Sequence, residues 1–299
     1  MHSRKVGRDN ELKHHALLYM PVSRSNRPVR YSSSEALLDA HLQRLQQRHG
    51  MALWMITRVR DDVMWLLRVN DDHYGLEQGH RIEWQRSYCI RMVEQDGPCI
   101  VTDTREASPY RAAPINDDLE IGAYVGLPLL DARGALFGTL CALDPKAQPA
   151  SLADRLPELE HDAALISFTL QRALRDAQQQ RLSTFIEHPD RCDETGLPSV
   201  VGWRDILAQE QGNCINLGEA SSVMYLQAAE DADSLVIADS LAALLRDQDS
   251  VAHLGNNQFG ILLADTHQRK AAMVADRIRD ALNAKRLLVK LQQEPLSPF

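Results

Sequence analysis

Short apolar runs alternate with turn-forming residues in the first half of the chain. Apolar residues recur at helical spacing from Leu37 to Leu45, after a Ser-Ser-Ser-Glu segment that is typical of a helix start. Strand-like runs follow at 52–59, 63–69, 99–102, 123–130 and 135–143. This pattern predicts an α+β domain over residues 32–175, in which helices cover one face of a sheet.

The second half of the chain begins with a long helical pattern. Apolar residues recur every three or four positions, close to a heptad, from residue 152 to about 185. Pro189 and the polar residues after it mark a domain boundary, so residues 176–190 are predicted to form a linker. A second α/β domain is predicted over 191–299, with helices at 202–209, 233–246 and 268–284 and single strands at 223–228 and 287–291.

Four residues, Gly255-Asn256-Asn257-Gln258, separate the two remaining apolar runs, Val251–Leu254 and Phe259–Leu263. Gly and Asn tolerate the positive φ angles that tight hairpin turns require. The sequence therefore predicts a β-hairpin here, and the physical pattern alone gives it no function.

Composition narrows the class of protein. A chain of 299 residues, with 44% hydrophobic and 25% charged residues, is typical of soluble globular proteins and long enough for two domains. Its apolar runs are too short to cross a membrane, and the N-terminus lacks the apolar core of a signal peptide, so we expect a cytoplasmic protein. The net charge of −8 gives no support for nucleic-acid binding.

The basic N-terminal residues and the cysteines have several interpretations. Residues 1–31 are either an arm that docks on an acidic surface, such as a partner protomer, or a solvated terminus. The five scattered cysteines include no CxxC pair, which favours reduced thiols over disulfides or a zinc site. The histidines are dispersed as well, so we expect no metal.

The first domain resembles the GAF family over about residues 35–175, through segments 87–89, 98–105, 126–134 and 137–144. The resemblance implies a sensor domain with a ligand pocket between the sheet and the segment from Tyr88 to Tyr124. The candidate pocket residues are Trp84, Tyr88, Cys89, Tyr110 and Tyr124. As alternatives, each aromatic is a core residue, and Cys89 is an inert buried thiol rather than an anchor for a chromophore or haem.

The hairpin resembles that of the GGDEF family, the diguanylate cyclases, whose Gly-Gly-Asp-Glu-Phe motif forms half of an active site that makes cyclic di-GMP from two GTP molecules. This chain keeps Gly255 and Phe259, but Asn256, Asn257 and Gln258 replace the second Gly, the acidic metal ligand and the following Glu. An amide brings no negative charge to Mg²⁺, and a side chain at position 256 intrudes where Gly lets the nucleotide approach. We therefore expect a degenerate hairpin without catalysis.

Two further segments depart from the GGDEF pattern. The family's other metal-binding Asp follows its first strand, but here residues 223–228 run almost directly into the next helix, and most of that segment is missing. Thr195-Gly196-Leu197-Pro198 resembles the opening motif of these domains, although Glu194, Ser199 and Val200 differ from it. The resemblance thus implies a shortened GGDEF-type α/β domain that lacks both halves of the metal site.

One feature of the family is complete. Many diguanylate cyclases carry an inhibitory Arg-x-x-Asp site, five residues before the hairpin, which binds cyclic di-GMP. Arg246 and Asp249 have this spacing, and Arg277 stands at about the distance of a further Arg in relatives. Arginine pairs with phosphate or guanine, and a carboxylate accepts from guanine N–H groups. The alternative is an ordinary ion pair at a helix end.

Together these features predict a non-catalytic, dimeric signalling regulator that binds cyclic di-GMP through Arg246, Asp249 and Arg277. The homodimer is expected to form through the GAF domain and the linking helix, and an active cyclase or another regulator is expected to be the partner protein. Two alternatives stay open. The chain is an interaction module that regulates a partner without binding cyclic di-GMP, or a sensor whose only ligand occupies the GAF pocket.

Overall fold

The first half of the chain folds around a six-stranded antiparallel sheet with the strand order β3-β2-β1-β6-β5-β4. The computed structural model describes residues 31–94, 97–187 and 190–296. The predicted N-terminal arm, residues 1–31, therefore lies outside the described residues apart from its last one. The elements of this half are α2 (Ser34–His49), β1 (Leu53–Arg60), β2 (Val63–Asp71), β3 (Arg81–Glu83), η3 (Trp84–Arg86), α3 (Tyr88–Glu94), β4 (Ile100–Val101), α4 (Ser108–Arg111), η4 (Pro114–Asp117), β5 (Ala123–Leu130) and β6 (Leu136–Asp144).

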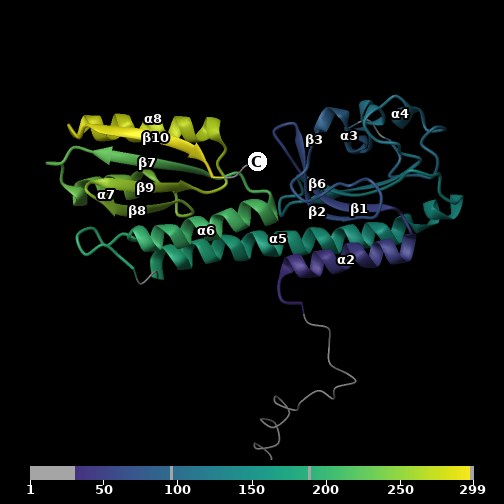
Figure 1. Ribbon diagram of the computed structural model, residues 1–299, viewed down its shortest axis with the longest axis horizontal. Helices are drawn as coiled ribbons and strands as arrows, with labels where there is room; N and C mark the ends of the chain where they lie inside the picture. The colour runs from purple at the N-terminus through teal and green to yellow at the C-terminus, as the bar shows by residue number, and fades with distance from the viewer. Residues whose placement is uncertain (1–30, 95–96, 188–189, 297–299) are drawn as a thin grey trace, which may run out of the picture. The chain divides into compact units, whose positions relative to one another are not determined.

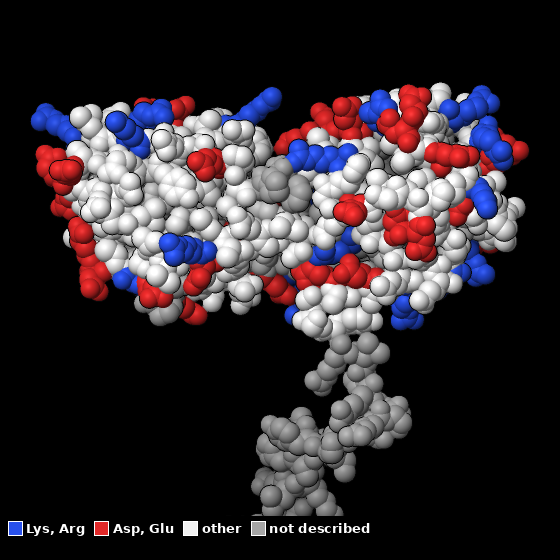
Figure 2. Space-filling view, viewed as in Figure 1, with Lys and Arg blue, Asp and Glu red and all other residues white. Residues whose placement is uncertain are grey.

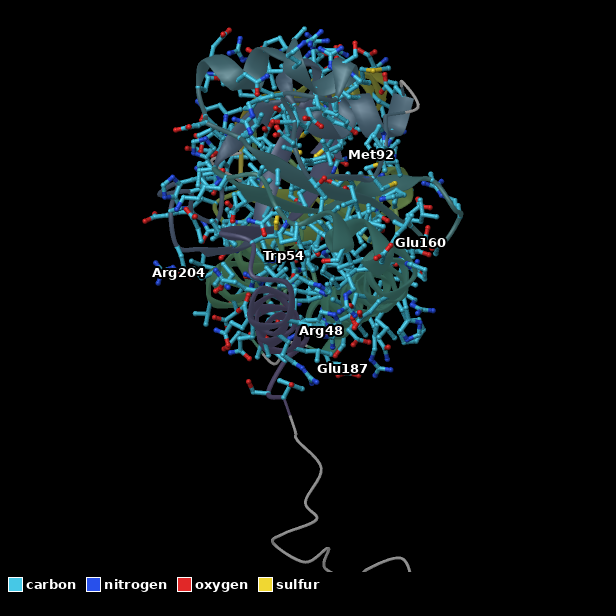
Figure 3. All side chains as sticks on the ribbon, turned by 90° about the vertical axis from the view of Figure 1, so that its right-hand side faces the viewer. Arg48, Trp54, Met92, Glu160, Glu187 and Arg204 are labelled. Atoms are coloured by element: carbon cyan, nitrogen blue, oxygen red, sulfur yellow. The ribbon has the colours of Figure 1, made fainter. Side chains whose placement is uncertain are left out.

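Helices cover both faces of this sheet, whereas the sequence pattern predicted one covered face. Leucines of α2 and of the long helix that follows the sheet pack with Trp54 of β1 in one buried layer. The segment that contains α3 and α4 packs on the opposite face, around Leu53 and Cys141. Figure 1 shows these helices on the two sides of the sheet. Figure 3 labels Trp54, which belongs to the layer that packs with α2. The second face is covered because strands β1 and β6 carry buried apolar residues at consecutive positions.

The short 3₁₀ helix η5 (Ala150–Arg155) leads into α5 (Leu156–Glu187), which continues through most of the predicted linker. Its first half buries Leu159, Ile166 and Leu170 against the sheet. Farther along, small residues allow α5 to pack closely against α6 (Val200–Leu217). The apolar residues that recur at near-heptad spacing along α5 thus pack largely against other parts of the same chain.

A buried ion network joins these two helices. The guanidinium of Arg181 on α5 donates from Nε to Glu210 Oε2 of α6 at 2.6 Å and from Nη2 to Glu219. Glu210 also accepts from Ser221 Oγ at 2.5 Å and from Asn213 Nδ2 at 3.1 Å. All three charged side chains are buried, and the single guanidinium is the positive charge that both carboxylates contact.

The second domain has the element order β-α-β-β-α-β after α6. The elements are β7 (Ser222–Ala228), α7 (Ser234–Leu244), β8 (Ser250–Gly255), β9 (Gln258–Leu263), α8 (Gln268–Ala284) and β10 (Val289–Pro295). They form a four-stranded antiparallel sheet with the order β10-β7-β9-β8. Buried residues of α7 and α8 cover one face, and Trp203 and Ile206 of α6 cover the other.

This arrangement confirms the predicted fold class, a GAF-type α+β domain, a long helix and a shortened α/β domain. Within the described ranges, no helix has both the length and the apolar composition that crossing a membrane requires.

Candidate functional site

The predicted hairpin is present between β8 and β9. Asn256 and Asn257 occupy its two turn positions with φ angles of 49° and 54°, and Gly255 before them has a φ of 90°. Two consecutive positive φ angles define the type I′ turn, which Asn tolerates better than most residues. The backbone of the turn therefore survives the changes from the family motif, as its Gly and Asn content predicted.

The side chain of Asn257 is directed into the protein and is only 8% exposed. Its Nδ2 group donates hydrogen bonds to the carbonyl oxygens of Ala229 at 2.7 Å and Ala232 at 2.9 Å, and its Oδ1 atom accepts from Ser234 Oγ. These partners belong to the short loop that joins β7 to α7 and to the first residue of α7. Asn257 thus links the loop between β7 and α7 to the hairpin through hydrogen bonds.

This geometry differs from what an acidic metal ligand would require. A carboxylate has no N–H group, so it could not donate to the carbonyls of Ala229 and Ala232 and would face their partial negative charges instead. The amide at Asn257 satisfies those carbonyls, and its neutral oxygen accepts a hydrogen bond from Ser234 Oγ. The side chain of Asn257 is therefore part of the internal hydrogen bonding of this domain.

The loop ends at Asp233, which caps helix α7. Its Oδ1 atom accepts from the backbone N–H of Leu235 at 2.9 Å and of Val236 at 3.3 Å. An acid at this position satisfies free N–H groups and interacts favourably with the helix dipole. The cap lets α7 begin only a few residues after the end of β7.

Replacing Asp233 by alanine is expected to lower the free energy of unfolding by about 1 kcal/mol, because two N–H groups lose their acceptor. Chemical denaturation of the purified chain measures the change. Asp231→Ala, at an exposed residue of the same loop, is the matched control and is expected to change stability by less than about 0.5 kcal/mol. Equal effects of the two changes would contradict the capping role.

A surface hollow of about 1350 Å³ lies beside the hairpin. The loop between β7 and α7 and the turn residues line it, together with polar residues of α8 and β10. Two of its acidic residues are Glu230 and Asp233, and the carboxylate of Asp233 is the helix cap. The hollow can accept a polar ligand, but its hairpin side offers amides rather than carboxylates.

The Arg-x-x-Asp residues lie just beyond the end of α7, in the connection to β8, and form an internal ion pair. The Arg246 guanidinium donates from Nη2 to Asp249 Oδ1 at 2.9 Å and from Nε to Oδ2 at 3.1 Å. It also donates to Thr266 Oγ1 at 2.8 Å. The side chain of Asp249 is 2% exposed, whereas that of Arg246 is 52% exposed. Arg246 can therefore contact a ligand in this conformation, and Asp249 is covered.

Arg277 of α8 lies close to this pair. Its Nη2 group donates to the carbonyl oxygen of Leu244, the last residue of α7, at 2.8 Å. The structure thus brings Arg277 and Arg246 to the same end of α7. Cyclic di-GMP binding by these residues stays a prediction.

The aromatic candidates of the GAF-type domain are all buried. The rings of Tyr88, Tyr110 and Tyr124 pack together with centroid distances of 4.9 to 5.3 Å, and Trp84 belongs to the same core layer. Burial raises the pKa of all three tyrosines. The structure brings the predicted pocket residues together, but as packed core residues. This is the alternative that was given for each aromatic in the sequence analysis.

Cys89 belongs to this core as well. Its sulfur lies 2.9 Å from Cys141 Sγ and 3.4 Å from Thr139 Oγ1, and all these groups are buried. Burial raises the pKa of the Cys141 thiol. The arrangement is that of a buried pair of thiols.

A hollow of about 540 Å³ in this domain lies elsewhere, beside α4 and the end of β6. Arg105, Arg111 and Lys146 contribute three cationic side chains to its lining, and none of the five candidates takes part. Most of its lining residues belong to the segment from Tyr88 to Tyr124 that was expected to border the pocket, but its cationic residues were not among the candidates. On the face shown in Figure 2, Lys and Arg side chains of the described residues alternate with Asp and Glu side chains.

Comparison with family models divides the chain in two. Residues 33–171 match the model of the GAF domain, and residues 235–298 match the model described as diguanylate cyclase, GGDEF domain. The second match is short, because it begins inside α7 and leaves α6 and β7 unmatched. The chain thus carries a GAF domain followed by a short GGDEF domain. No curated protein sequence matches it significantly.

Solved structures resemble each half. The GAF domain of PixJ from Thermosynechococcus elongatus, in its blue-light absorbing form, is 16% identical; the match covers 52% of this chain and 94% of that chain, with a TM-score of 0.40. Diguanylate cyclase SiaD from Pseudomonas aeruginosa, solved with its activator SiaC, is 22% identical, with 48% and 64% covered and a TM-score of 0.34. The GGDEF domain of TpbB (YfiN) from the same organism is 20% identical, with 34% and 73% covered and a TM-score of 0.32.

Proposed function

We propose that this chain, a GAF domain followed by a short GGDEF domain, is a signalling regulator that does not make cyclic di-GMP. The observation that carries the proposal is the position of Asn257, whose amide hydrogen-bonds the loop between β7 and α7 and leaves no carboxylate at the hairpin. Phosphoryl transfer by this family depends on Mg²⁺ held by acidic groups. Formation of cyclic di-GMP from GTP by the purified chain would contradict the proposal.

Helix α5 supports a role in transmitting a signal. It packs on the sheet of the GAF domain through its first half and is linked to α6 by the buried Arg181 network in its second half. A ligand that repacks the GAF domain would therefore act on a helix that the GGDEF domain contacts directly. We regard the GAF domain as the sensor and α5 as the connecting element.

The exposed side of α5 supports a homodimer. Leu165 and Phe168 lie one helical turn apart and are 46% and 60% exposed. Two large apolar side chains on neighbouring turns of a surface helix favour contact with another apolar surface. A second copy of the chain offers the same face, so a symmetric pair would cover both.

A second proposed function is reception of cyclic di-GMP. The half-exposed guanidinium of Arg246 and the nearby Arg277 favour it, because two arginines at one site can pair with the two phosphates or stack on the guanine bases. Asp249 would then hold Arg246 in place rather than contact the ligand. If no cyclic di-GMP is bound, regulation of a partner protein through the domain surface is the remaining function.

Calorimetric titration of the purified chain with cyclic di-GMP tests this function. We expect Arg277→Ala to weaken binding about tenfold or more, because a charge-assisted hydrogen bond contributes roughly 1.5–3 kcal/mol. Arg246→Ala should act in the same direction, with thermal unfolding as a check, since it also leaves Asp249 without its partner. Arg279→Ala is the control, because Arg279 forms an exposed ion pair with Asp276 on the same helix. Absence of heat with the unmodified chain would exclude the receptor function.

A further inference from the structure

Three potential metal ligands meet at the start of the GGDEF domain. Cys192 and Glu194 lie in the turn that precedes α6, and His253 lies in β8, two residues before Gly255. One ligand atom from each lies within 4.8 Å of the other two. His253 is buried, Cys192 is half-buried and Glu194 is exposed. The group is distinct from the positions that bind magnesium in cyclases.

Backbone hydrogen bonds hold the two sides of this group in place. The turn is closed by Cys192 N–H to Leu197 O and by Gly196 N–H to Cys192 O, each at 2.8 Å. It is fixed to β8 by the N–H of His253, which donates to Pro198 O at 2.9 Å. These bonds bring Cys192 and His253 together without help from a ligand.

The imidazole of His253 is held as well. Its ring is stacked on that of Phe259, with centroids 4.8 Å apart and planes 10° apart. Its Nδ1 atom faces Cys192 Sγ at 3.1 Å, and its Nε2 atom is buried without a hydrogen-bond partner. Nδ1 is therefore the nitrogen that is available to a ligand next to the sulfur.

We propose that Cys192, His253 and Glu194 bind a zinc ion. Zinc accepts a thiolate, an imidazole and a carboxylate in one tetrahedral site, whereas Mg²⁺ and Ca²⁺ prefer oxygen ligands alone. A thiolate and a carboxylate together balance the charge of Zn²⁺, so the occupied site would be neutral overall. Sulfur and nitrogen ligands of tetrahedral zinc stand roughly 3.5 Å apart by the usual bond lengths, which requires only a small opening of the observed contact.

The fourth position of this site would face the hollow beside the hairpin. Glu194 and His253 both line that hollow, together with Asn256, Asn257 and Gln258. A water molecule or an oxygen of a ligand can complete the coordination there. The ion would link the turn before α6 to strand β8. Zinc would therefore stabilise the hairpin, which lacks the catalytic carboxylates of the family motif.

Sequence spacing gave no sign of this site. Cys192 and His253 are 61 residues apart, so the ligands meet only when β8 has paired in the sheet. Without a metal, the same pair is a thiol hydrogen-bonded to an imidazole. The test therefore has to detect metal–sulfur coordination directly.

The experiment uses the full chain, reduced, stripped of metal with a chelator and titrated with Co²⁺ and then Zn²⁺. We expect one Co²⁺ per chain, with a thiolate-to-cobalt charge-transfer band and the intense visible bands of tetrahedral cobalt, both removed by Zn²⁺. Cys192→Ser should abolish the charge-transfer band. Glu194→Gln, at an exposed residue, should weaken zinc binding about 100-fold or more while the fold stays intact.

Matched controls are Cys99→Ser, which removes a thiol outside the site, and Asp193→Asn, which removes the neighbouring exposed carboxylate. Both should leave the cobalt spectrum and the zinc affinity unchanged. A spectrum without the charge-transfer band, or a band that Cys192→Ser leaves in place, would overturn the proposal. Equal loss of zinc affinity in Glu194→Gln and Asp193→Asn would remove Glu194 from the site.

Discussion

Replacing Arg181 by methionine is expected to lower the free energy of unfolding by about 3–5 kcal/mol, the largest single effect that this structure predicts. Methionine fills much of the same volume but carries no charge. Glu210 and Glu219 would then remain buried side by side without the guanidinium that both contact. Two like charges in a poorly solvated site repel each other and lose hydrogen bonds at once.

Denaturant unfolding of the purified variants measures this effect. Arg175→Met is the matched control, because Arg175 is an exposed arginine on the same helix, and we expect a change within about 0.5 kcal/mol. Adding Glu219→Gln to Arg181→Met should recover part of the loss, since it removes one of the two unpaired charges. A loss below about 1 kcal/mol in Arg181→Met would show that the network does not hold α5 to α6.

Replacing Asn257 by aspartate, which restores the acidic residue of the family motif, is expected to destabilise the domain by about 2–3 kcal/mol and to yield no cyclase activity. The change removes both N–H donors and leaves the carbonyls of Ala229 and Ala232 facing a carboxylate. Each buried polar group that loses its partner costs about 1–3 kcal/mol. We expect no activity because the resemblance places a second metal-binding Asp after the first strand, where this chain has the short loop from Ala229 to Asp233.

Asn256→Asp is the matched control for this change. It makes the same chemical replacement one residue earlier in the same turn, at an exposed side chain with a similar φ angle. We expect a change within about 0.5 kcal/mol. A stable Asn257→Asp variant that forms cyclic di-GMP would show that the hairpin is only one substitution away from catalysis.

Much of the fold could be predicted because strong local signals agree with the final packing. The hairpin is an example, since Gly255, Asn256 and Asn257 all adopt the positive φ angles that their residue types favour. Helix α8 begins and ends where its apolar spacing predicted, at Gln268 and Ala284. Helix α6 was predicted to end near Gln209 but continues to Leu217, where Gly218 closes it with a φ of 64°.

The prediction for α6 was short because polar residues and Gly212 interrupt its later turns. Two buried residues, Cys214 and Leu217, nevertheless continue its apolar face. Tertiary packing against α5 therefore extends the helix beyond the point that local propensity favours.

The candidate sites could be predicted less well, because their chemistry depends on contacts between distant segments. The presence of Asn257 where the resemblance implies an acidic residue was visible in the sequence, but its hydrogen bonds to Ala229 and Ala232 depend on the folded loop. An aromatic composition is shared by ligand pockets and packed cores, so the sequence could not decide between them for Tyr88 and Tyr124.

The measurement that tests the central claim most directly is formation of cyclic di-GMP from GTP by the purified full chain in the presence of Mg²⁺ or Mn²⁺. Product is followed by chromatography, with a catalytically active diguanylate cyclase as the positive control. We expect no cyclic di-GMP above the level of a sample without protein, and the same result for Asn257→Ala. Product formed by the unmodified chain and lost in Asn257→Ala would show that this hairpin is an active site.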